Sequence, residues 1–296
     1  MRLDRESRAL LGSARIGMLA LAAKPQPLVN PAAFSFSRDA VWMTTSRHAM
    51  KLALARRDPR ASFLVDDGRH CVLLEGELDV FDALDVPSQI RALLEGPGFY
   101  LSLARYAVKN AAFVGGYLRD LARIPGDWWP QNRAVLRLRA RRAWSLPTVP
   151  TPPAEPASIP LVPASVRRTL AHVAVAYLCT LSDDAPLMAP ALWAADGSIS
   201  VVTGSADFLG LGRRGPAGLV IESHHTYRAT RMIGAYVRGQ LSADGDAKRS
   251  VKERYGLDIA PPGMGLDLEP ERVTWWRGFK LQTAESEELT SRRAAP

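Results

Sequence analysis

The sequence is poor in the residues that build a disulfide framework, a metal cluster or a membrane span. Its 296 residues include two cysteines and five histidines, and no Cys-x-x-Cys spacing occurs. Neither a disulfide-rich fold nor a metal site is therefore expected. No apolar run reaches the ~18–20 residues that cross a bilayer, and the N-terminus lacks the apolar stretch of a secretory signal. We predict a cytoplasmic protein with no membrane partner.

The two cysteines lie in segments that are typical of strands. Cys71 begins the run CVLLEGELDVF, and Cys179 lies within VAVAYLCTL. Thiols in such runs usually behave as small buried hydrophobic groups. We therefore expect both side chains in the core and neither in a reactive site.

The net charge of +8 raises the question of a nucleic-acid partner. The densest basic cluster, RAVLRLRARRAW at residues 133–144, alternates apolar and basic side chains. This period of two is typical of a half-buried strand with its arginines toward water. A nucleic-acid module would instead show a basic stripe interleaved with exposed aromatic residues. We predict no nucleic-acid partner.

A proline-rich segment divides the chain into two pieces of similar length. Residues 149–163 read VPTPPAEPASIPLVP, and prolines at this density exclude regular helix and central strand. The predicted organisation is a first domain at 1–148, a linker at 149–163 and a second domain at 164–296.

The two pieces repeat one order of elements: three strands, a short helix, two strands, a helical segment and a closing strand. Tight Gly/Asp turns between consecutive strands favour antiparallel meanders that close into barrels. The chain is therefore predicted to be mainly β with helices. The predicted strands of the first piece are 16–23, 28–37, 40–45, 60–67, 71–81 and 133–144, and those of the second are 173–181, 186–197, 198–204, 217–224, 232–243 and 272–285.

The clearest match between the pieces lies in their short predicted helices, at 46–59 and 205–216. LALARRDP in the first aligns with LGLGRRGP in the second, so that Leu52 corresponds to Leu209 and Pro59 to Pro216. The first piece also carries an insertion at about 87–121, whose length and mixed polarity predict one or two helices against the barrel.

Several short motifs of the first piece occur in a fixed order. Thr44-Thr45 ends a predicted strand, Lys51 follows in a short helix, Asp58-Pro59 opens the next strand, and Glu75-Gly76 ends another. This ordered set resembles the pyridoxamine-phosphate-oxidase-like split barrels, over about residues 10–145 and more weakly over 165–285. The resemblance implies two tandem split β-barrels of the FMN-binding kind, packed as an intramolecular pseudo-dimer.

The resemblance also implies a cofactor in the cleft between the barrels. FMN is the first expectation, a deazaflavin of the F420 type is an alternative, and haem is a further one. A helix N-terminus with basic side chains suits a terminal phosphate. We predict that Thr44, Thr45, Ser46, Arg47 and Lys51 bind the cofactor, with Ser46 as the N-cap of the helix.

The second piece provides an internal comparison. Counting eight residues back from Pro216 gives Phe208, where the same count from Pro59 gives Lys51. Asp207 stands beside it and would repel a phosphate. We therefore expect one competent anion site per chain, in the first barrel, with the second barrel supplying the opposite wall.

The residues of that opposite wall are left open by the sequence. Tyr227, Arg228 and Arg231 are candidates, and solvated loop positions are the alternative. His224 and His225 are adjacent, and neighbouring strand residues point to opposite faces, so no shared metal ion is expected.

The expected function is that of a flavin-dependent oxidoreductase acting on a small organic substrate. Deazaflavin-dependent reduction and non-catalytic binding of a flavin or haem are the alternatives. Phe34 and Cys71 stand where pyridoxamine phosphate oxidases proper carry flavin-facing polar residues, so the vitamin-forming activity itself is not expected. The sequence leaves open the substrate, the catalytic side chain, and whether the chain is a monomeric pseudo-dimer or a homodimer.

Overall fold

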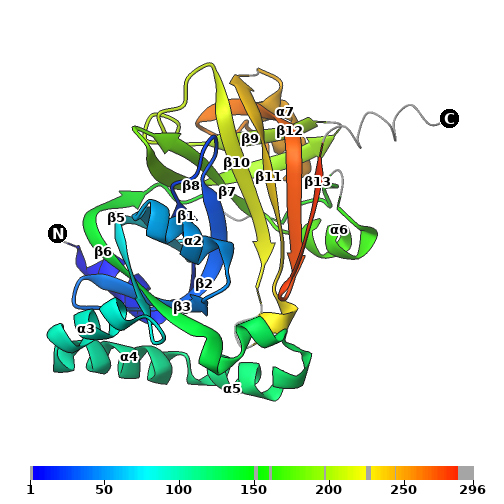
Figure 1. Cartoon of the computed structure of the whole chain (residues 1–296). Coiled ribbons are helices and arrows are strands. Elements are labelled where there is room, and N and C mark those ends of the chain that lie inside the picture. Colours follow the sequence, from blue (N-terminus) through cyan, green and yellow to red (C-terminus); the bar gives the residue numbers. More distant parts are fainter. Residues whose placement is uncertain are drawn as a thin grey trace.

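Two β-sheets and a layer of helices make up the fold. The computed structural model describes residues 3–149, 153–159, 162–196, 198–224, 228–243 and 245–285. The sheets lie against each other, and helices gather at one end of the first (Figure 1). The predicted fold class, mainly β with helices, is confirmed. Among the described helices, none has the length and apolar character needed to span a bilayer.

The first sheet is a closed antiparallel barrel with the strand order β1-β2-β3-β6-β5-β4. Its turns follow from the sequence: Arg38 and Asp39 both have a φ of 54°, which closes the tight β2–β3 hairpin. The strands are β1 (Ile16–Leu21), β2 (Leu28–Ser37), β3 (Ala40–Ser46), β4 (Arg60–Asp66), β5 (Cys71–Asp82) and β6 (Arg133–Leu146).

The second sheet repeats this strand order. β11 pairs with both β10 and β12, so that β7 to β12 form a ring in the order β7-β8-β9-β12-β11-β10, and β13 is added beside β12. The internal repeat inferred from the sequence is thus present in the topology. The strands are β7 (Val175–Ser182), β8 (Ala185–Asp196), β9 (Ser198–Thr203), β10 (Arg214–Ser223), β11 (Ile233–Ala243), β12 (Met264–Arg277) and β13 (Lys280–Glu285).

A glycine at a β-bulge recurs at the same place in both barrels. The pairing of β5 with β6 shifts register at Gly76, and the pairing of β11 with β12 shifts at Gly239. A Cβ at either position would lie within 2 Å of a backbone carbonyl oxygen, 1.9 Å from that of Arg139 or 1.8 Å from that of Glu269. Only glycine permits this approach of two strands, and the bulges give an independent alignment of the two repeats.

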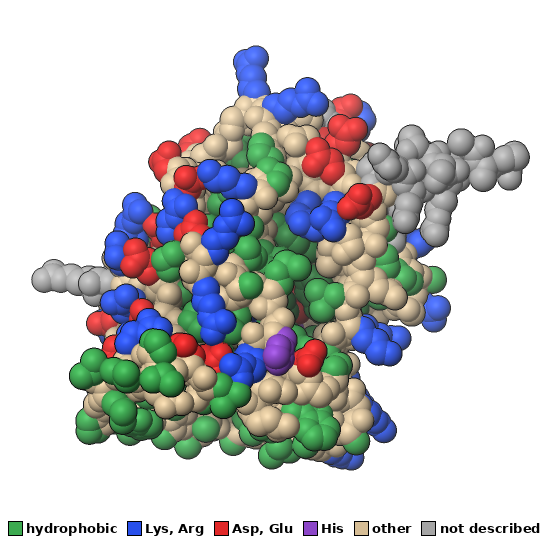
Figure 2. All heavy atoms as spheres, viewed as in Figure 1, with side chains coloured by type: hydrophobic (Ala, Val, Ile, Leu, Met, Phe, Trp, Pro, Cys, Tyr) green, Lys and Arg blue, Asp and Glu red, His purple; other side chains and the backbone are tan. Residues whose placement is uncertain are grey.

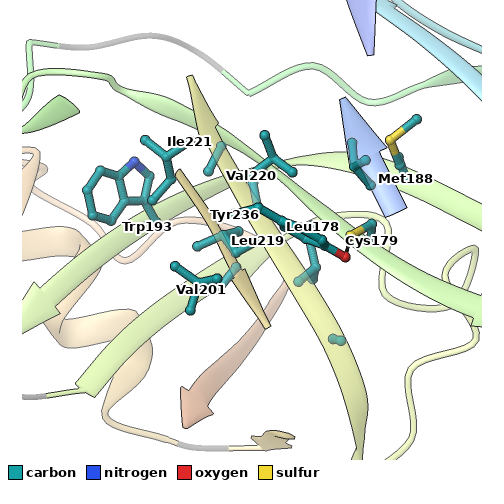
Figure 3. Close-up of a cluster of buried hydrophobic side chains, with 14 of the residues drawn as sticks. Leu178, Cys179, Met188, Trp193, Val201, Leu219, Val220, Ile221 and Tyr236 are labelled. Carbon is teal, nitrogen blue, oxygen red and sulfur yellow. Dashed lines mark hydrogen bonds between the residues drawn. The ribbon is translucent and has the colours of Figure 1, made fainter. Parts of the chain in front are cut away.

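The barrels are held together by a continuous apolar core. In β1, Leu19 and Leu21 point into the first barrel, whereas Met18 and Ala20 belong to the cluster shared with the second barrel. Both faces of this strand are covered, which explains its unbroken apolar sequence. The shared cluster continues through the second barrel, where Trp193 and Tyr236 pack among aliphatic side chains (Figure 3).

Both cysteines are buried and free, as predicted. Cys179 donates to the carbonyl of Gly218 at 3.1 Å and lies beside Tyr236 (Figure 3). Burial raises the pKa of the Cys179 thiol to about 12 and that of the Cys71 thiol well above its usual value. Both are therefore neutral, unreactive core groups at physiological pH.

Helices cover the ends and one side of the first barrel. The predicted insertion forms three helices, α3, α4 and α5, rather than one or two, because turns at Glu95-Gly96 and Asn110 divide it; the three lie beneath that barrel in Figure 1. The insertion is longer than predicted, because three 3-10 turns extend it from the end of α5 to the start of β6. The helices are α1 (Arg5–Ser13), α2 (Met50–Arg57), α3 (Val86–Leu94), α4 (Pro97–Lys109), α5 (Ala111–Arg119), η1 (Leu121–Arg123), η2 (Gly126–Trp128), η3 (Pro130–Asn132), α6 (Ala164–Leu170), η4 (Ala229–Arg231) and α7 (Ala247–Arg254).

Two predicted elements of the second piece are wrong. Residues 205–216 form turns and then the start of β10 rather than a helix. Gly210 has a φ of 63°, which ends the helical geometry after about one turn. The predicted closing strand at 272–285 is two strands, because Gly278 (φ 59°) turns the chain between β12 and β13.

The described part of the predicted linker is packed rather than free. Ala157 and Ile159 are buried in the shared core, and the amide of Ala157 donates to the carbonyl of Ala171 at 3.1 Å. The linker thus lies along the second barrel. The domain boundaries at 148 and 163 stay a prediction, consistent with a first barrel that ends at Leu146 and α6 beginning at Ala164.

Candidate functional site

A cavity between the two barrels is the main candidate site. It encloses about 850 Å³ of space, part of it open to solvent, and is lined by residues of both barrels. The first barrel supplies its floor from β2, β3 and β6, and the insertion supplies a wall from α4 and α5. The second barrel supplies η4 and the hairpin of β12 and β13, whose ends reach α5 in Figure 1.

Lys51 reaches this cavity because α2 is anchored by its neighbours. Leu52 and Ala55 are buried in the core of the first barrel, which fixes the face that α2 presents inward. Lys51, one residue before Leu52, is half-buried and lines the cavity. Burial and, after it, the positive charge of Arg133 lower the pKa of Lys51 to about 8.

Arg133 is a second cation of the cavity that the sequence analysis did not identify. It begins β6 and donates to Thr44 twice, at 2.6 Å to Oγ1 and at 3.1 Å to the carbonyl oxygen. The hydroxyl of Tyr106 lies 3.1 Å from the same Thr44 Oγ1. The guanidinium of Arg133 also faces the rings of Tyr117 and Trp128, at 5.6 and 5.8 Å. Burial lowers the pKa of Arg133 as well.

The charge of these two cations is not balanced by the protein. Among the residues that the structure describes, no carboxylate forms an ion pair with Lys51 or Arg133. A buried arginine elsewhere in the barrel does have such a partner: Arg137 contacts Asp79 at 2.8 Å. Two neighbouring cations in a sheltered cavity are costly without an anion, so this end of the cavity is suited to an anionic group.

The cavity also has an aromatic wall, which adjoins Arg133, and it holds two unused hydrogen-bond donors. Tyr117, Trp128 and Phe279 pack together, with centroid distances of 5.0 Å for Trp128 to Phe279 and 6.3 Å for Tyr117 to Phe279. The hydroxyl of Tyr117 and the indole N–H of Trp276 are buried without a hydrogen-bond partner among the described residues. Because buried polar groups are nearly always paired, these atoms suit a flat ligand that carries acceptor atoms.

Three of the five predicted binding residues do not line the cavity. Thr44 and Lys51 do line it. Thr45 is buried at the next position of β3, on the face that Val41 and Met43 turn into the barrel. Arg47 contacts the buried carboxylate of Asp82 at 3.0 Å.

The expectation that Ser46 caps the helix is wrong. Helix α2 begins at Met50, with Ala49 at the N-cap position and no side-chain cap. Ser46 lies in β3, where its hydroxyl donates to the carbonyl of Asp127 at 2.5 Å and accepts from the amide of His48 at 3.1 Å. The hydroxyl thus stabilises the turn between strand and helix, because a serine bonds most readily to an amide two residues along the chain.

The second barrel holds the α5 wall through an ion pair. Asp120, at the end of α5, accepts from Arg228, which precedes η4, and from Thr230, which lies within it. These bonds lower the pKa of the Asp120 carboxyl to about 2, so it is charged at neutral pH. Arg228 therefore has a structural role, Arg231 does not line the cavity, and Tyr227 lies outside the described residues.

Removing this ion pair is expected to loosen the cavity wall. In Asp120→Asn the carboxylate is lost, so α5 should be held less firmly and a bound ligand should dissociate several-fold faster. Stopped-flow displacement of a ligand bound in the cavity measures this rate. Asp127→Asn, which changes an exposed acid of the same insertion, is the control and should leave the rate unchanged. Equal rates for Asp120→Asn and the unsubstituted protein would refute the role of the ion pair.

The histidines supply no shared metal site in the described part of the chain. His224 lies 2.5 Å from Glu222, an interaction that raises the pKa of the imidazole. His225 lies outside the described residues. No group of three or more candidate metal ligands occurs among the described residues.

The equivalent region of the second barrel has lost both cations. Because the bulges at Gly76 and Gly239 are equivalent, their partners Ala140 in β6 and Pro270 in β12 are equivalent too. The same number of residues before each partner, Arg133 of the first barrel corresponds to Gly263 of the second. Phe208, which stands for Lys51, packs its ring against that of Trp144 from the first barrel at 5.3 Å. Aromatic packing therefore stands here in place of the Lys51 side chain, and a single anion site per chain stays a prediction.

The part of the chain that matches a known protein family lies in the first barrel and the start of its insertion. Residues 4–98 match the family model for pyridoxamine 5'-phosphate oxidase. The resemblance to this family that the sequence motifs indicated is thereby confirmed. The matched segment contains Thr44 and Lys51, whereas Arg133 and the whole second barrel lie beyond it.

Solved structures with similarity to the chain each span about half of it. An FAD-binding protein from Mesorhizobium loti is 21% identical, with 48% of this chain and 93% of that protein covered and a TM-score of 0.32. An FMN-binding protein related to pyridoxamine 5'-phosphate oxidase, from Nostoc punctiforme, is 17% identical (49% and 86% covered, TM-score 0.35). A protein titled F420 reductase is 15% identical (48% and 98% covered, TM-score 0.32). No curated protein matches the chain.

The predicted flavin-facing role of Phe34 does not agree with its position. Phe34 is fully buried in the first barrel, where its ring packs against Phe63 at a centroid distance of 4.8 Å. Cys71 lies in the core shared by the two barrels. The residues of β2 that do line the cavity are Asn30, Pro31, Ala32 and Ala33.

Proposed function

We propose that this chain is a flavin-dependent oxidoreductase that holds FMN between its barrels and oxidises or reduces a small organic substrate. The observation that carries the proposal is the pair of cations, Lys51 and Arg133, without a protein counter-charge at one end of an aromatic cavity. A phosphate dianion needs such fixed positive charge, and a flat ring system needs apolar walls with a few donors.

The residues of the cavity fit FMN by chemical type. Lys51, Arg133 and the hydroxyl of Thr44 would bind the phosphate. The N–H of Trp276 and the hydroxyl of Tyr117 are unused donors beside the aromatic wall, and flavin carbonyl and ring-nitrogen atoms are acceptors. When bound, a flavin supplies the hydride or electron chemistry, while the protein binds, orients and excludes water.

Titration of the purified chain tests the cofactor. FMN should quench protein fluorescence and bind with an affinity clearly above that of riboflavin, which has the same ring but no phosphate. A deazaflavin of the F420 type that binds more tightly than FMN would shift the proposal to a deazaflavin-dependent enzyme. Oxidation of a reduced nicotinamide by the loaded protein would distinguish an enzyme from a flavin carrier.

Cofactor affinity is expected to depend on pH through Lys51. The pKa of about 8 means that Lys51 is charged below pH 8 and neutral above it. A phosphate ester carries its second negative charge above about pH 6. FMN affinity should therefore be greatest between about pH 6 and pH 8 and fall about ten-fold by about pH 9.5.

The Lys51→Arg variant is the control for this pH dependence, because an arginine stays charged throughout the range. The FMN affinity of this variant should not fall at high pH. It should still decrease at low pH, where the phosphate loses its second negative charge. A dissociation constant that does not change between about pH 7 and about pH 9.5 in the unsubstituted chain would show that Lys51 does not contact the bound anion.

A further inference from the structure

The helices of the insertion expose an unusual amount of apolar surface. Ten of the fourteen large hydrophobic side chains that are exposed among the described residues lie between Leu84 and Leu118. In Figure 2 hydrophobic side chains gather where Figure 1 places α3 and α4. We refer to these ten as the insertion face; they are Leu84, Val86, Ile90, Leu93, Leu94, Tyr100, Leu101, Val108, Val114 and Leu118.

Helix α4 has apolar side chains on its outer side as well as on the side that covers the barrel. Its side against the barrel buries Ser102 and Tyr106 together with Phe99, and Ser102 donates to the carbonyl of Gly98 at 2.9 Å. Its outer side carries Leu101 and Val108, which are 53% and 77% exposed. A surface helix normally turns its apolar side inward, so the outer side of α4 is suited to an apolar environment outside this chain.

The charge of the same helices is of one sign. Helices α3, α4 and α5 contain four basic residues and no acidic one, namely Arg91, Arg105, Lys109 and Arg119. The acids that border the helices have partners: Asp85 accepts from Ser88, Glu95 from Arg137 and Asp120 from Arg228. Arg91, Arg105 and Arg119 are exposed. The insertion face is therefore an apolar surface with basic side chains around it, a combination typical of helices that lie in the interface of an anionic membrane.

We infer that the insertion face binds the surface of an anionic lipid membrane, with α3 and α4 lying along the lipid headgroups. A second copy of the chain fits this surface less well. A symmetric dimer would place the same face against itself. Its exposed arginines would then meet one another, because the nearby acids Asp85 and Glu95 already bind Ser88 and Arg137. A membrane carries the complementary charge and accepts the leucines in its acyl region. This inference does not depend on the proposed flavin chemistry.

Co-sedimentation of the full chain with lipid vesicles tests the inference. Vesicles of phosphatidylcholine with about a quarter of phosphatidylglycerol should bind at least about ten-fold more protein than vesicles of phosphatidylcholine alone, and added salt should reduce the binding. The double variant Leu94→Glu, Val108→Glu should lower the bound fraction about ten-fold, because it places two negative charges on the insertion face. Both side chains are largely exposed, so the substitutions should not disturb the fold.

Ile259→Glu is the matched control, because Ile259 is 81% exposed on the second barrel and should have no part in binding. Circular dichroism and urea denaturation show whether each variant keeps its fold. Failure of the unsubstituted chain to bind anionic vesicles would overturn the inference. It would also be overturned by a dimer in light scattering that the Leu94→Glu, Val108→Glu variant converts to a monomer without any vesicle binding.

Discussion

Replacing Lys51 by alanine should weaken FMN binding about 10- to 100-fold while leaving riboflavin binding unchanged. A charge-assisted hydrogen bond contributes roughly 1.5–3 kcal/mol, and riboflavin has no phosphate through which to lose it. Arg133→Gln should have an effect of similar size, because it removes the second charge and keeps a donor for Thr44. The two cations are neighbours, so the double variant need not show the sum of the single effects.

Arg57→Ala is the control for this comparison, since Arg57 lies on the same helix but does not line the cavity. It removes one positive charge from α2 and should change FMN affinity less than two-fold. A loss of FMN and riboflavin affinity by the same factor in Lys51→Ala would mean that Lys51 supports the cavity without contacting the phosphate.

Gly239→Ala should destabilise the protein by about 3 kcal/mol or more, because a Cβ there would overlap the backbone carbonyl of Glu269 at 1.8 Å and the strands would have to separate. Gly76→Ala should behave alike in the first barrel. The free energy of unfolding from urea denaturation measures both effects. If Gly239→Ala unfolds at the same urea concentration as the unsubstituted protein, the bulge does not require glycine.

Gly215→Ala is the matched control for Gly239→Ala. Gly215 lies in β10 beside β11, and a Cβ added to it would have no other atom within 4 Å. An alanine there should be neutral or stabilising by up to about 1 kcal/mol. The contrast between two glycines on neighbouring strands separates a steric effect from a general loss of strand flexibility.

The strands could be predicted from the sequence because each is a short apolar or alternating run bounded by turn residues. Segments such as 28–37 and 40–45 agree with β2 and β3 to within a residue. The repeat could be predicted as well, because LALARRDP in the first piece matches LGLGRRGP in the second. In the structure the matched Leu52 and Leu209 are both buried. The structure of residues 205–216 could not be predicted in this way. A helix was expected there because the segment matches the helix of the first piece, but the positive φ of Gly210 ends the helical geometry.

The candidate site was only partly predictable. Lys51 was found because its spacing to Pro59 is local in sequence. Arg133 was not found, because it begins a run of arginines that are all typical of the solvent-exposed face of a strand. It reaches the cavity because β6 pairs with β3, with Arg133 opposite Ser46. The aromatic wall combines Tyr117 and Trp128 with Phe279 of the second barrel. Their proximity depends on how the two barrels pack and has no local signal in the sequence.

A crystal structure of the chain with FMN tests the central claim most directly. We expect one FMN per chain, its phosphate in contact with Lys51 and Arg133 and its ring against Tyr117, Trp128 and Phe279. A phosphate bound at the Phe208 side, or a cavity in which the aromatic side chains leave no room for the ring, would contradict the account even though both barrels would be unchanged.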